Sequence, residues 1–412
     1  MHDERHNPNV IAKHASALLS ERIGSEVRLP VSNVISTWGS IVVHCRVQLG
    51  QAQLPADLIV KKVREDRCGY DPDSPAAPNA AHWLFNDWAA LQFLGQIPHD
   101  PPLSPTFYGG SRDFGLIVLE DLGESETPNT ADTLHGNNSV VAEETLIEHA
   151  SLIGQLHSST LGKAEAYLRV RSALGPTPRP EKLYQDPWSD ARLAPVHPTE
   201  VDEVIKLYCA GLDSVGLRAH PGLADEIAHV TSTVEVNPGP LLAYCKGDQN
   251  AAADYIRRAG QPRFFDFGAG GLRHALIEGM PGRMTWGCAM RIPERVIARM
   301  EKAYQLRLAE GYAQAADDRV FHRCLVEAGA RWNIFHVVHR LPDALEADRQ
   351  RGPTTLRQQT IAWIEAFAHL SEELAQMTAL GKSAREMAAT LQQLWPEASV
   401  LPFYPAFCQR GP

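Results

Sequence analysis

Two aspartates near the middle of the chain have the residue type and spacing for phosphoryl-transfer chemistry. Asp248 closes the tripeptide Lys246-Gly247-Asp248, and Asp266 opens Asp266-Phe267-Gly268 further along the chain. Transfer to a hydroxyl needs one carboxylate that takes the proton of the acceptor and another that holds Mg²⁺ against the nucleotide phosphates. Asp248 is the candidate for the first role and Asp266 for the second, because Mg²⁺ prefers carboxylate oxygens.

Apolar segments must carry these two aspartates to one cleft. Residues 241–245, Leu-Leu-Ala-Tyr-Cys, predict a strand that leads to Asp248, and residues 263–265 predict one that leads to Asp266. The segment from about 255 to 263 between them predicts a short hairpin. We therefore expect both carboxylates on adjacent strand ends, although Gly-Asp is also common in turns and both residues could simply cap them.

The apolar periodicity of the whole chain predicts strands first and helices later. A helix is expected at about 8–23, strands at 41–49, 58–60 and 115–123, a loop at 64–81 and a helix at 83–94. From Glu143 the pattern is mostly helical, and one helix carries Trp363, Phe367, Leu370, Leu374 and Met377 in register. This order predicts an α+β protein of two lobes, a small β-rich N-lobe of residues 1–122 and a large, mainly helical C-lobe of residues 123–412.

The composition is that of an ordinary soluble globular protein. The 412 residues include 44% hydrophobic and 21% charged residues, and no apolar run is long enough to span a membrane. Seven cysteines without metal-type spacing, and a polar N-terminus, indicate reduced thiols in a cytoplasmic protein. The net charge of −10 argues against nucleic-acid binding and is compatible with a cationic substrate, although surface acidity usually serves solubility.

The order of these motifs resembles the aminoglycoside phosphotransferase and choline kinase group, which are small-molecule relatives of the protein kinases. The group has a His-Gly-Asp catalytic loop, four variable residues, an Asn, and then an Asp-Phe-Gly or similar triplet. Residues 247–248 and 266–268 match these motifs. Four upstream segments resemble further motifs of the group, in the same order. Residues 58–61 resemble the phosphate-binding strand, and residues 85–87 resemble the helix that follows it. Residues 116–123 resemble the hinge, and the Leu156-His157 pair resembles the end of the helix beneath the hinge.

The resemblance implies a role for several further residues. Lys61 would grip the nucleotide phosphates, Asp87 would hold that lysine, and the backbone around Glu120 and Leu122 would receive the base. The turn that contains Gly39 and Ser40 stands where the group has a glycine-rich loop over the phosphates, but a lone glycine is equally compatible with an ordinary turn.

Two alternatives concern the lysine. Lys61 could be an ordinary strand-end residue, although an isolated ammonium in a low-dielectric site is costly and calls for a partner such as Asp87. Lys62 is an adjacent competitor, but the alternation of a strand turns it to the opposite face. Asp87 replaces the Glu that the group more often carries.

The sequence departs from the group in the catalytic loop. Lys246 stands where the usual histidine would be, and the position of the Asn is occupied by Ala253. A one-residue insertion would place Asp254 there as a second Mg²⁺ ligand, and Asn250 is a lesser candidate. His274, beside apolar residues, is expected in the core or, less favoured, in the acceptor pocket.

These observations predict a phosphotransferase that uses ATP or GTP with Mg²⁺. The acceptor would be a hydroxyl of a sugar, aminocyclitol, nucleoside or amino alcohol, bound by the helical region after Ala275. Three alternatives stay open: a catalytically weak or inactive nucleotide-binding relative, favoured by Lys246 and Ala253, a nucleotidyl-transferring enzyme of the same fold, and a helical binding protein whose aspartates cap turns.

Overall fold

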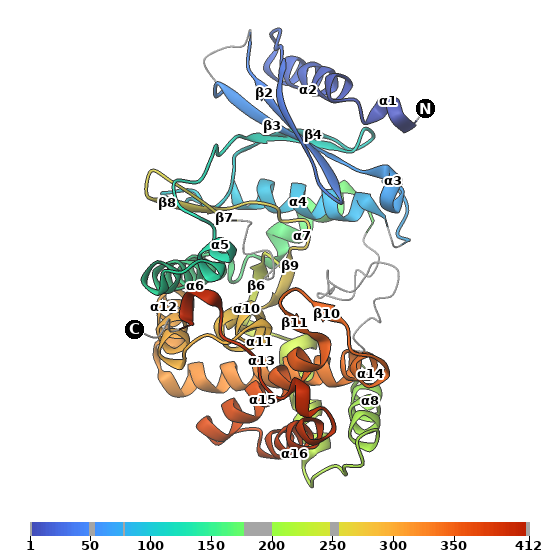
Figure 1. Cartoon of the computed structure of the whole chain (residues 1–412). Helices are drawn as coiled ribbons and strands as arrows, with labels where there is room; N and C mark the ends of the chain where they lie inside the picture. Colours follow the sequence, from blue (N-terminus) through green and yellow to red (C-terminus); the bar gives the residue numbers. More distant parts are fainter. Residues whose placement is uncertain (1, 49–53, 77–78, 177–199, 248–254, 409–412) are drawn as a thin grey trace.

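The chain combines a five-stranded antiparallel sheet with a larger, mainly helical part (Figure 1). The computed structural model describes residues 2–48, 54–76, 79–176, 200–247 and 255–408. The sheet and its helices lie at one end of the molecule, the helices from α8 onward lie toward the other end, and α7 lies between them beside α4. Among the described residues, no helix combines the length and the apolarity that crossing a bilayer requires.

The sheet has the strand order β1-β2-β3-β5-β4. Its strands are β1 (Val31–Ser36), β2 (Ser40–Arg46), β3 (Asp57–Val63), β4 (Phe107–Ser111) and β5 (Leu116–Glu120). Every neighbouring pair is antiparallel. The strands β1, β2 and β3 are neighbours in the order of the chain and form a meander, whereas α3 and α4 are inserted between β3 and β4.

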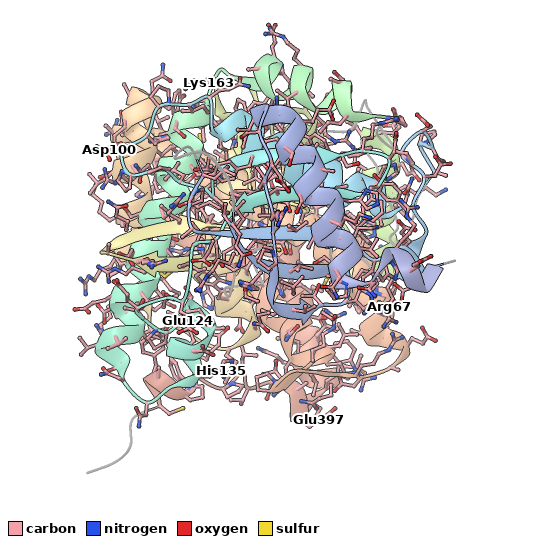
Figure 2. All side chains as sticks on the ribbon, turned by 90° about the horizontal axis from the view of Figure 1, so that it is seen from above. Arg67, Asp100, Glu124, His135, Lys163 and Glu397 are labelled. Atoms are coloured by element: carbon pink, nitrogen blue, oxygen red, sulfur yellow. The ribbon has the colours of Figure 1, made fainter. Side chains whose placement is uncertain are left out.

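One helix covers each face of this sheet. Helix α2 (Pro8–Ile23) packs on the face made by Val43, Val60 and Val118, which are opposite one another on β2, β3 and β5 and fully buried. Seen from above, α2 crosses over the strands (Figure 2). Helix α4 (Ala80–Leu94) packs with Ile117 and Leu119 on the opposite face. The helices predicted at 8–23 and 83–94 are both present.

The faces of the sheet separate the two lysines of β3. Lys62 points to the α2 side, where it is fully buried and its Nζ donates to Glu65 Oε1 at 2.7 Å. Glu65 belongs to α3 (Glu65–Cys68), a short helix inside the segment expected to be loop. Lys61 points to the other face, as strand alternation predicts. Both lysines lie inside β3, which continues to Val63 rather than ending before them.

The helical part is built around α6 and α13. Its longer helices are α5 (Thr130–His135), α6 (Ser139–Thr160), α7 (Ala164–Leu174), α8 (Val201–Asp213), α9 (Leu223–Val230), α12 (Glu294–Gly311), α13 (Asp318–His339), α14 (Leu341–Glu346), α15 (Leu356–Leu374) and α16 (Thr378–Leu394). Helix α15 ends at Leu374, so Met377, expected within it, lies outside in the left-handed conformation that precedes α16.

Three two-stranded ladders accompany these helices, and they correct one expectation. They pair β6 (Leu242–Cys245) with β9 (Gly271–His274), β7 (Tyr255–Arg258) with β8 (Gln261–Phe264), and β10 (Gln350–Arg351) with β11 (Thr354–Thr355). The predicted hairpin is β7–β8. The strands that lead toward Asp248 and Asp266 are not neighbours, because β6 pairs with β9, the strand that follows Asp266-Phe267-Gly268.

The close packing of α6 against α12 can be tested with a substitution at Gly154. Gly154 in α6 lies against α12, and a Cβ on it would stand 2.8 Å from the carbonyl oxygen of Tyr304. Gly-to-Ala in a helix interior ordinarily stabilises by about 1 kcal/mol. We expect Gly154→Ala instead to lower the free energy of unfolding by about 1–2 kcal/mol through overpacking, measured as a lower unfolding temperature. Glu144→Ala, at an exposed position of α6, is the control and should change little. A stabilised Gly154→Ala protein would contradict this packing.

Candidate active site

One ammonium group joins three separate elements of the chain. Lys61 Nζ on β3 lies 2.7 Å from Asp87 Oδ2 on α4 and 2.7 Å from Asp266 Oδ1, which follows β8. The ion pair between Lys61 and Asp87, expected from the sequence, is therefore present, and Asp266 joins it. The lysine side chain is 17% exposed and that of Asp87 only 3%, whereas Asp266 is 49% exposed.

Helix α4 also holds the backbone of the Asp266 triplet. Asp87 uses its second oxygen, Oδ1, to accept from Phe267 N at 2.9 Å, and the neighbouring Asn86 donates from Nδ2 to the carbonyl oxygen of Gly268 at 3.1 Å. Arg171 on α7 orients Asn86 by donating from Nε to its Oδ1 at 2.8 Å. Asn86 and Arg171 thus position the backbone of this triplet, and the sequence analysis predicted neither role. The adjacency of Asn86 to Asp87 was the only signal for either of them.

The charges of this group reinforce one another. Burial disfavours the ammonium of Lys61, but Asp266 and Asp87 outweigh it and raise the pKa of Lys61 above its ordinary value. The charge of Lys61, against the effect of burial and with help from Lys246, lowers the pKa of Asp266 to about 2. Asp266 is therefore ionised at neutral pH. Its half-exposed carboxylate is a hard oxygen donor suited to Mg²⁺.

Asp266 stands in an unusual backbone conformation. Its φ is +57°, in the left-handed region that non-glycine residues rarely adopt. Asp tolerates this region better than most residues, and strain of this kind is held only where surrounding contacts fix it. Here the hydrogen bonds of Phe267 and Gly268 to α4 supply those contacts.

The strand register shows what else shares the face of Lys61. Val42 lies opposite Lys61, His44 lies opposite Ile59, and Leu119 lies on the far side of Ile59. Val42, Ile59 and His44 are half-buried, while the residues of the α2 face beside them are fully buried. This face therefore offers a partly open apolar surface between Lys61 and the end of β5.

The segment after β5, expected as the hinge, is tied down on both sides. Arg263 on β8 donates from its two terminal nitrogens to the two carboxylate oxygens of Glu120, at 2.8 and 2.7 Å. Arg258 on β7 donates to the carbonyl oxygen of Leu122 at 3.1 Å. On the sheet side, His44 Nδ1 lies 2.9 Å from Asp121 Oδ2. The side chain of Glu120 and the carbonyl of Leu122 are thus already engaged within the protein.

The turn expected over the phosphates is compact. Thr37 N donates to the carbonyl oxygen of Ser40 at 2.9 Å, and Ser40 N donates to Thr37 Oγ1 at 3.0 Å. Ser40 is buried, whereas a Cβ on Gly39 would meet no atom within 4 Å. Any contribution of Gly39 and Ser40 to phosphate binding would therefore come from turn backbone, and the hydroxyl of Ser40 faces Thr37 Oγ1 at 3.0 Å.

An aromatic pair lies beside this turn. Trp38, at the tip, is 59% exposed, and its ring centroid lies 5.6 Å from that of Trp83 in the first turn of α4. The backbone of Trp83 in turn lies against Gly268. The tip of the β1–β2 turn is therefore linked through α4 to the triplet that begins with Asp266, a connection that apolar periodicity alone does not reveal.

A buried carboxylate anchors the start of the catalytic loop. Glu278, in α10 (Ala275–Glu278), accepts from Gly247 N at 2.7 Å and from Lys246 N at 2.8 Å. His157 Nε2 lies 3.0 Å from the same carboxylate, and His157 Nδ1 lies 2.9 Å from the hydroxyl of Tyr304. Although burial opposes it, the bonds to His157 and Gly247 lower the pKa of Glu278 to about 2. The family resemblance of the sequence identified His157, whereas nothing in the sequence identified Glu278.

Several predicted site residues lie outside the described part of the chain. Asp248, Asn250 and Asp254 are not among the described residues, so their roles as base and metal ligands stay predictions. Lys246, which precedes them, is buried. His274 is 2% exposed and caps α10, where burial lowers its pKa to about 4. This confirms the core position favoured for His274.

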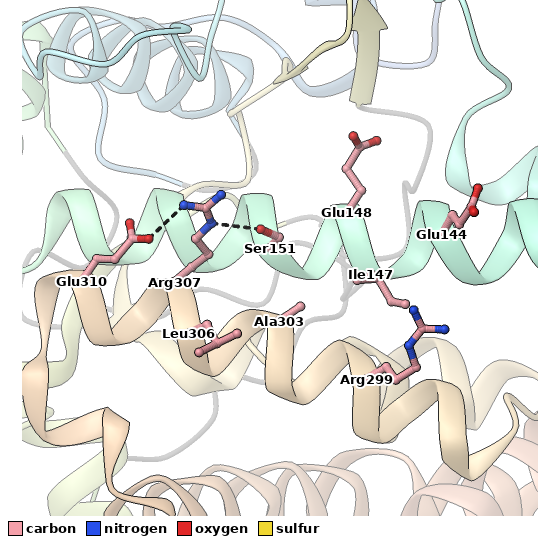
Figure 3. Close-up of a pocket in the computed structure, with 9 residues that line it drawn as sticks. All are labelled: Glu144, Ile147, Glu148, Ser151, Arg299, Ala303, Leu306, Arg307 and Glu310. Carbon is pink, nitrogen blue, oxygen red and sulfur yellow. Dashed lines mark hydrogen bonds and ion pairs between the residues drawn. The ribbon is translucent and has the colours of Figure 1, made fainter.

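Two other places in the fold are poorly suited to the chemistry. His157, Cys245 and Glu278 offer buried ligand atoms within 4.8 Å of one another, but hydrogen bonds already engage both oxygens of Glu278. Burial raises the pKa of the Cys245 thiol, which disfavours the thiolate that a metal needs. The groove in Figure 3 lies between α6 and α12, where Arg307 bonds Ser151 and Glu310, and it contains none of the predicted site residues.

No family model and no curated protein matches the chain. Solved structures that resemble it include a choline/ethanolamine kinase family protein from Mesorhizobium loti, at 12% identity, 91% coverage of this chain, 99% of that chain and a TM-score of 0.37. An ethanolamine kinase from Plasmodium vivax has 10% identity, 89% coverage of both chains and a TM-score of 0.41. An aminoglycoside phosphotransferase from Alicyclobacillus acidocaldarius has 9% identity, 92% and 96% coverage and a TM-score of 0.33. Because all three sequence identities and all three TM-scores are low, these similarities give no support to a functional assignment of the site.

The anchor made by Glu278 predicts a pH-dependent stability. Glu278→Gln removes the charge and places an amide against backbone N–H donors, so we expect it to cost about 3–5 kcal/mol of unfolding free energy at pH 7. A folded-state pKa of about 2 against an ordinary 4.5 gives stability that is full above pH 4.5 and is lost as the pH falls toward 2. The difference in unfolding temperature between wild type and variant should therefore shrink from pH 5 to pH 3.

The control is Glu294→Gln, at an exposed position of α12. Its unfolding temperature should follow that of the wild type across the same pH range. A wild-type advantage over Glu278→Gln that stays constant down to pH 3 would show that Glu278 is not held as an anion in the folded protein.

Proposed function

We propose that this protein is a Mg²⁺-dependent phosphotransferase that moves the γ-phosphoryl group of ATP, or GTP, to a hydroxyl of a small molecule. The observation that carries the proposal is the position of Lys61 Nζ, 2.7 Å from both Asp87 and Asp266. The proposal includes a bilobal, protein-kinase-like arrangement, with residues 1–122 as the N-lobe and residues 123–412 as the C-lobe. The nucleotide would lie between them.

The direction of the nucleotide follows from the strands. Its triphosphate would lie at Lys61, and its base would lie toward the end of β5, under Ile59 and next to the backbone of Glu120 and Leu122. Ile59 precedes Lys61 by two strand positions, a rise of about 7 Å, on the same face of β3. The apolar surface of Val42 and Ile59 suits a flat base, while the turn of Gly39 and Ser40 would cover the phosphates.

The residues of the chain would divide the chemistry among them. Bound Mg²⁺ would neutralise charge on the phosphate oxygens, and Asp266 would hold it, with Asp254 or Asn250 as a further ligand. Lys61 would bind phosphate oxygens while Asp87 keeps its ammonium in place. Asp248 would orient the acceptor hydroxyl and take its proton. Positioning and electrostatics would supply most of the rate.

A catalytically weak relative is the alternative with a specific observation behind it. Lys246 takes the place of the usual histidine and is buried, so the catalytic loop begins with a cation in a low-dielectric site. Its charge acts on Asp266 and on His149, whose pKa burial and Lys246 lower to about 3. Such a protein would bind Mg²⁺-ATP without transferring phosphate to any acceptor.

Ligand-induced stabilisation tests the nucleotide and metal assignments together. A ligand at a hundred times its dissociation constant stabilises the folded state by about 2.7 kcal/mol. We expect Mg²⁺-ATP to raise the unfolding temperature of the wild type, and Asp266→Ala to lose the Mg²⁺-dependent part of that shift. Asp113→Ala, at a 93% exposed position, is the control and should respond as the wild type does. A full Mg²⁺-dependent response in Asp266→Ala would remove Asp266 from the metal site.

The base is tested separately. Asp248→Asn keeps the shape of the side chain but cannot take a proton, so turnover should fall by about 10²–10⁴-fold. Nucleotide affinity, measured by the same thermal shift, should stay near that of the wild type. Unchanged turnover would exclude Asp248 as the base, and nucleotide binding by the wild type without transfer to any acceptor would support the weak relative instead.

A further inference from the structure

A group of basic side chains gathers where α13 ends and the β10–β11 hairpin stands. We call His336, His339, Arg340 and Arg351 the α13 basic cluster. His339 and Arg340 follow His336 by three and four positions at the C-terminal end of α13, where Arg340 is the C-cap residue, so both lie next to His336 on the helix surface. Arg351 comes from β10, a separate element. In a chain with a net charge of −10, such a concentration of positive charge stands out.

The electrostatics of His336 show how positive this place is. The imidazole is 7% exposed, and its pKa is lowered well below the ordinary value by burial and then by the charges of Arg340, Arg331 and Arg351. The charges that act on it most strongly all belong to cations. His336 is therefore neutral at pH 7, and the guanidinium groups of Arg340 and Arg351 carry positive charge in the cluster.

The two guanidinium groups of the cluster have no carboxylate partner in the part of the chain that the structure describes. Among the described residues, neither Arg340 nor Arg351 has a carboxylate within 4.0 Å, and the buried Nε2 of His336 has no hydrogen-bond partner. Asp343 favours the charged form of Arg351 but forms no ion pair with it. The C-terminal end of a helix such as α13 carries partial negative charge, which readily attracts one cation. It does not account for Arg351 on a hairpin or for the unpartnered nitrogen of His336.

The cluster is connected to the catalytic loop through short, packed contacts. Trp332, one turn before His336, donates from Nε1 to the carbonyl oxygen of Ile277 at 2.9 Å, and the next residue is Glu278, which holds the backbone of Lys246 and Gly247. The ring of His336 stacks on Trp363 of α15, with centroids 3.7 Å apart. Figure 1 shows the β10–β11 hairpin standing on the helical part, on the side that faces β9.

We propose that the α13 basic cluster binds the acceptor, and that the acceptor is an anion, a hydroxyl compound that also carries a carboxylate or phosphate group. This inference rests on the proposed phosphotransferase function and narrows its substrate class. Guanidinium groups match the two oxygens of such anions in a planar, bidentate way. A cationic acceptor, which the net charge alone would permit, would be repelled by Arg340 and Arg351 unless it also brought an anion.

Inorganic phosphate is the probe, and the full chain is tested with saturating Mg²⁺-AMP-PNP so that the nucleotide phosphates already occupy Lys61. At constant ionic strength, phosphate should raise the unfolding temperature of the wild type in a saturable way. The double variant Arg340→Ala, Arg351→Ala should need at least tenfold more phosphate for the same shift. Its response to Mg²⁺-AMP-PNP should be unchanged. The matched control is Arg28→Ala, Arg46→Ala, which removes two arginines that are 63% and 72% exposed on the sheet part.

Choline at the same concentrations is the cationic counter-probe and should give no stabilisation. An equal phosphate response in the Arg340–Arg351 variant, no phosphate response in the wild type, or a larger shift with choline than with phosphate would each overturn the inference. If Mg²⁺-AMP-PNP itself fails to stabilise the wild type, the phosphotransferase proposal fails. The phosphate response and its dependence on the two arginines still decide whether this is an anion site.

Discussion

The ammonium of Lys61, shared between Asp87 and Asp266, is the constraint on which the candidate active site depends. A largely buried lysine is tolerated only with partners, because an isolated charge in such a place would be costly. Its two carboxylates come from α4 and from the end of the β7–β8 hairpin, so a strand, a helix and a distant loop must meet at one point. A triphosphate would compete with Asp266 for Lys61 while Mg²⁺ competes with Lys61 for Asp266. Binding both together keeps every charge paired.

Hydrogen bonds from side chains to the backbone hold this charged centre in place. One oxygen of Asp87 accepts from Lys61, and the other accepts from the backbone N–H of Phe267. Asn86 donates to the carbonyl oxygen of Gly268. Glu278 does the equivalent work for the backbone of Lys246 and Gly247 from the opposite side. The backbone next to Asp266, and the backbone that leads to the proposed base, is therefore fixed by side chains, which is the arrangement that accurate positioning requires.

Local rules were enough to predict the parts of the structure that strand alternation controls. The opposite directions of Lys61 and Lys62 follow from the two-residue repeat of a strand, and the β7–β8 hairpin follows from two short strands around a turn. The pairing of β6 with β9 could not be predicted, because alternation identifies a buried face and not the partner strand. Glu278 was missed for a similar reason. No spacing in the sequence relates it to His157 or to Lys246 and Gly247, and only the fold, which packs α10 beside β6, brings these groups within hydrogen-bond distance.

The distribution of charge along the cleft joins the two proposals into one argument. Bringing an anionic acceptor to a triphosphate places like charges within a few ångströms, and their repulsion grows as water leaves the site. Lys61 and a metal ion on Asp266 would neutralise the phosphate end, and the anion of the acceptor would need cations of its own on the helical side. Arg340 and Arg351 supply positive charge on that side without carboxylates to neutralise it among the described residues. An active site with separate cations for each of two anions could hold both at once, whereas a cationic acceptor would leave Arg340 and Arg351 without an anion to bind.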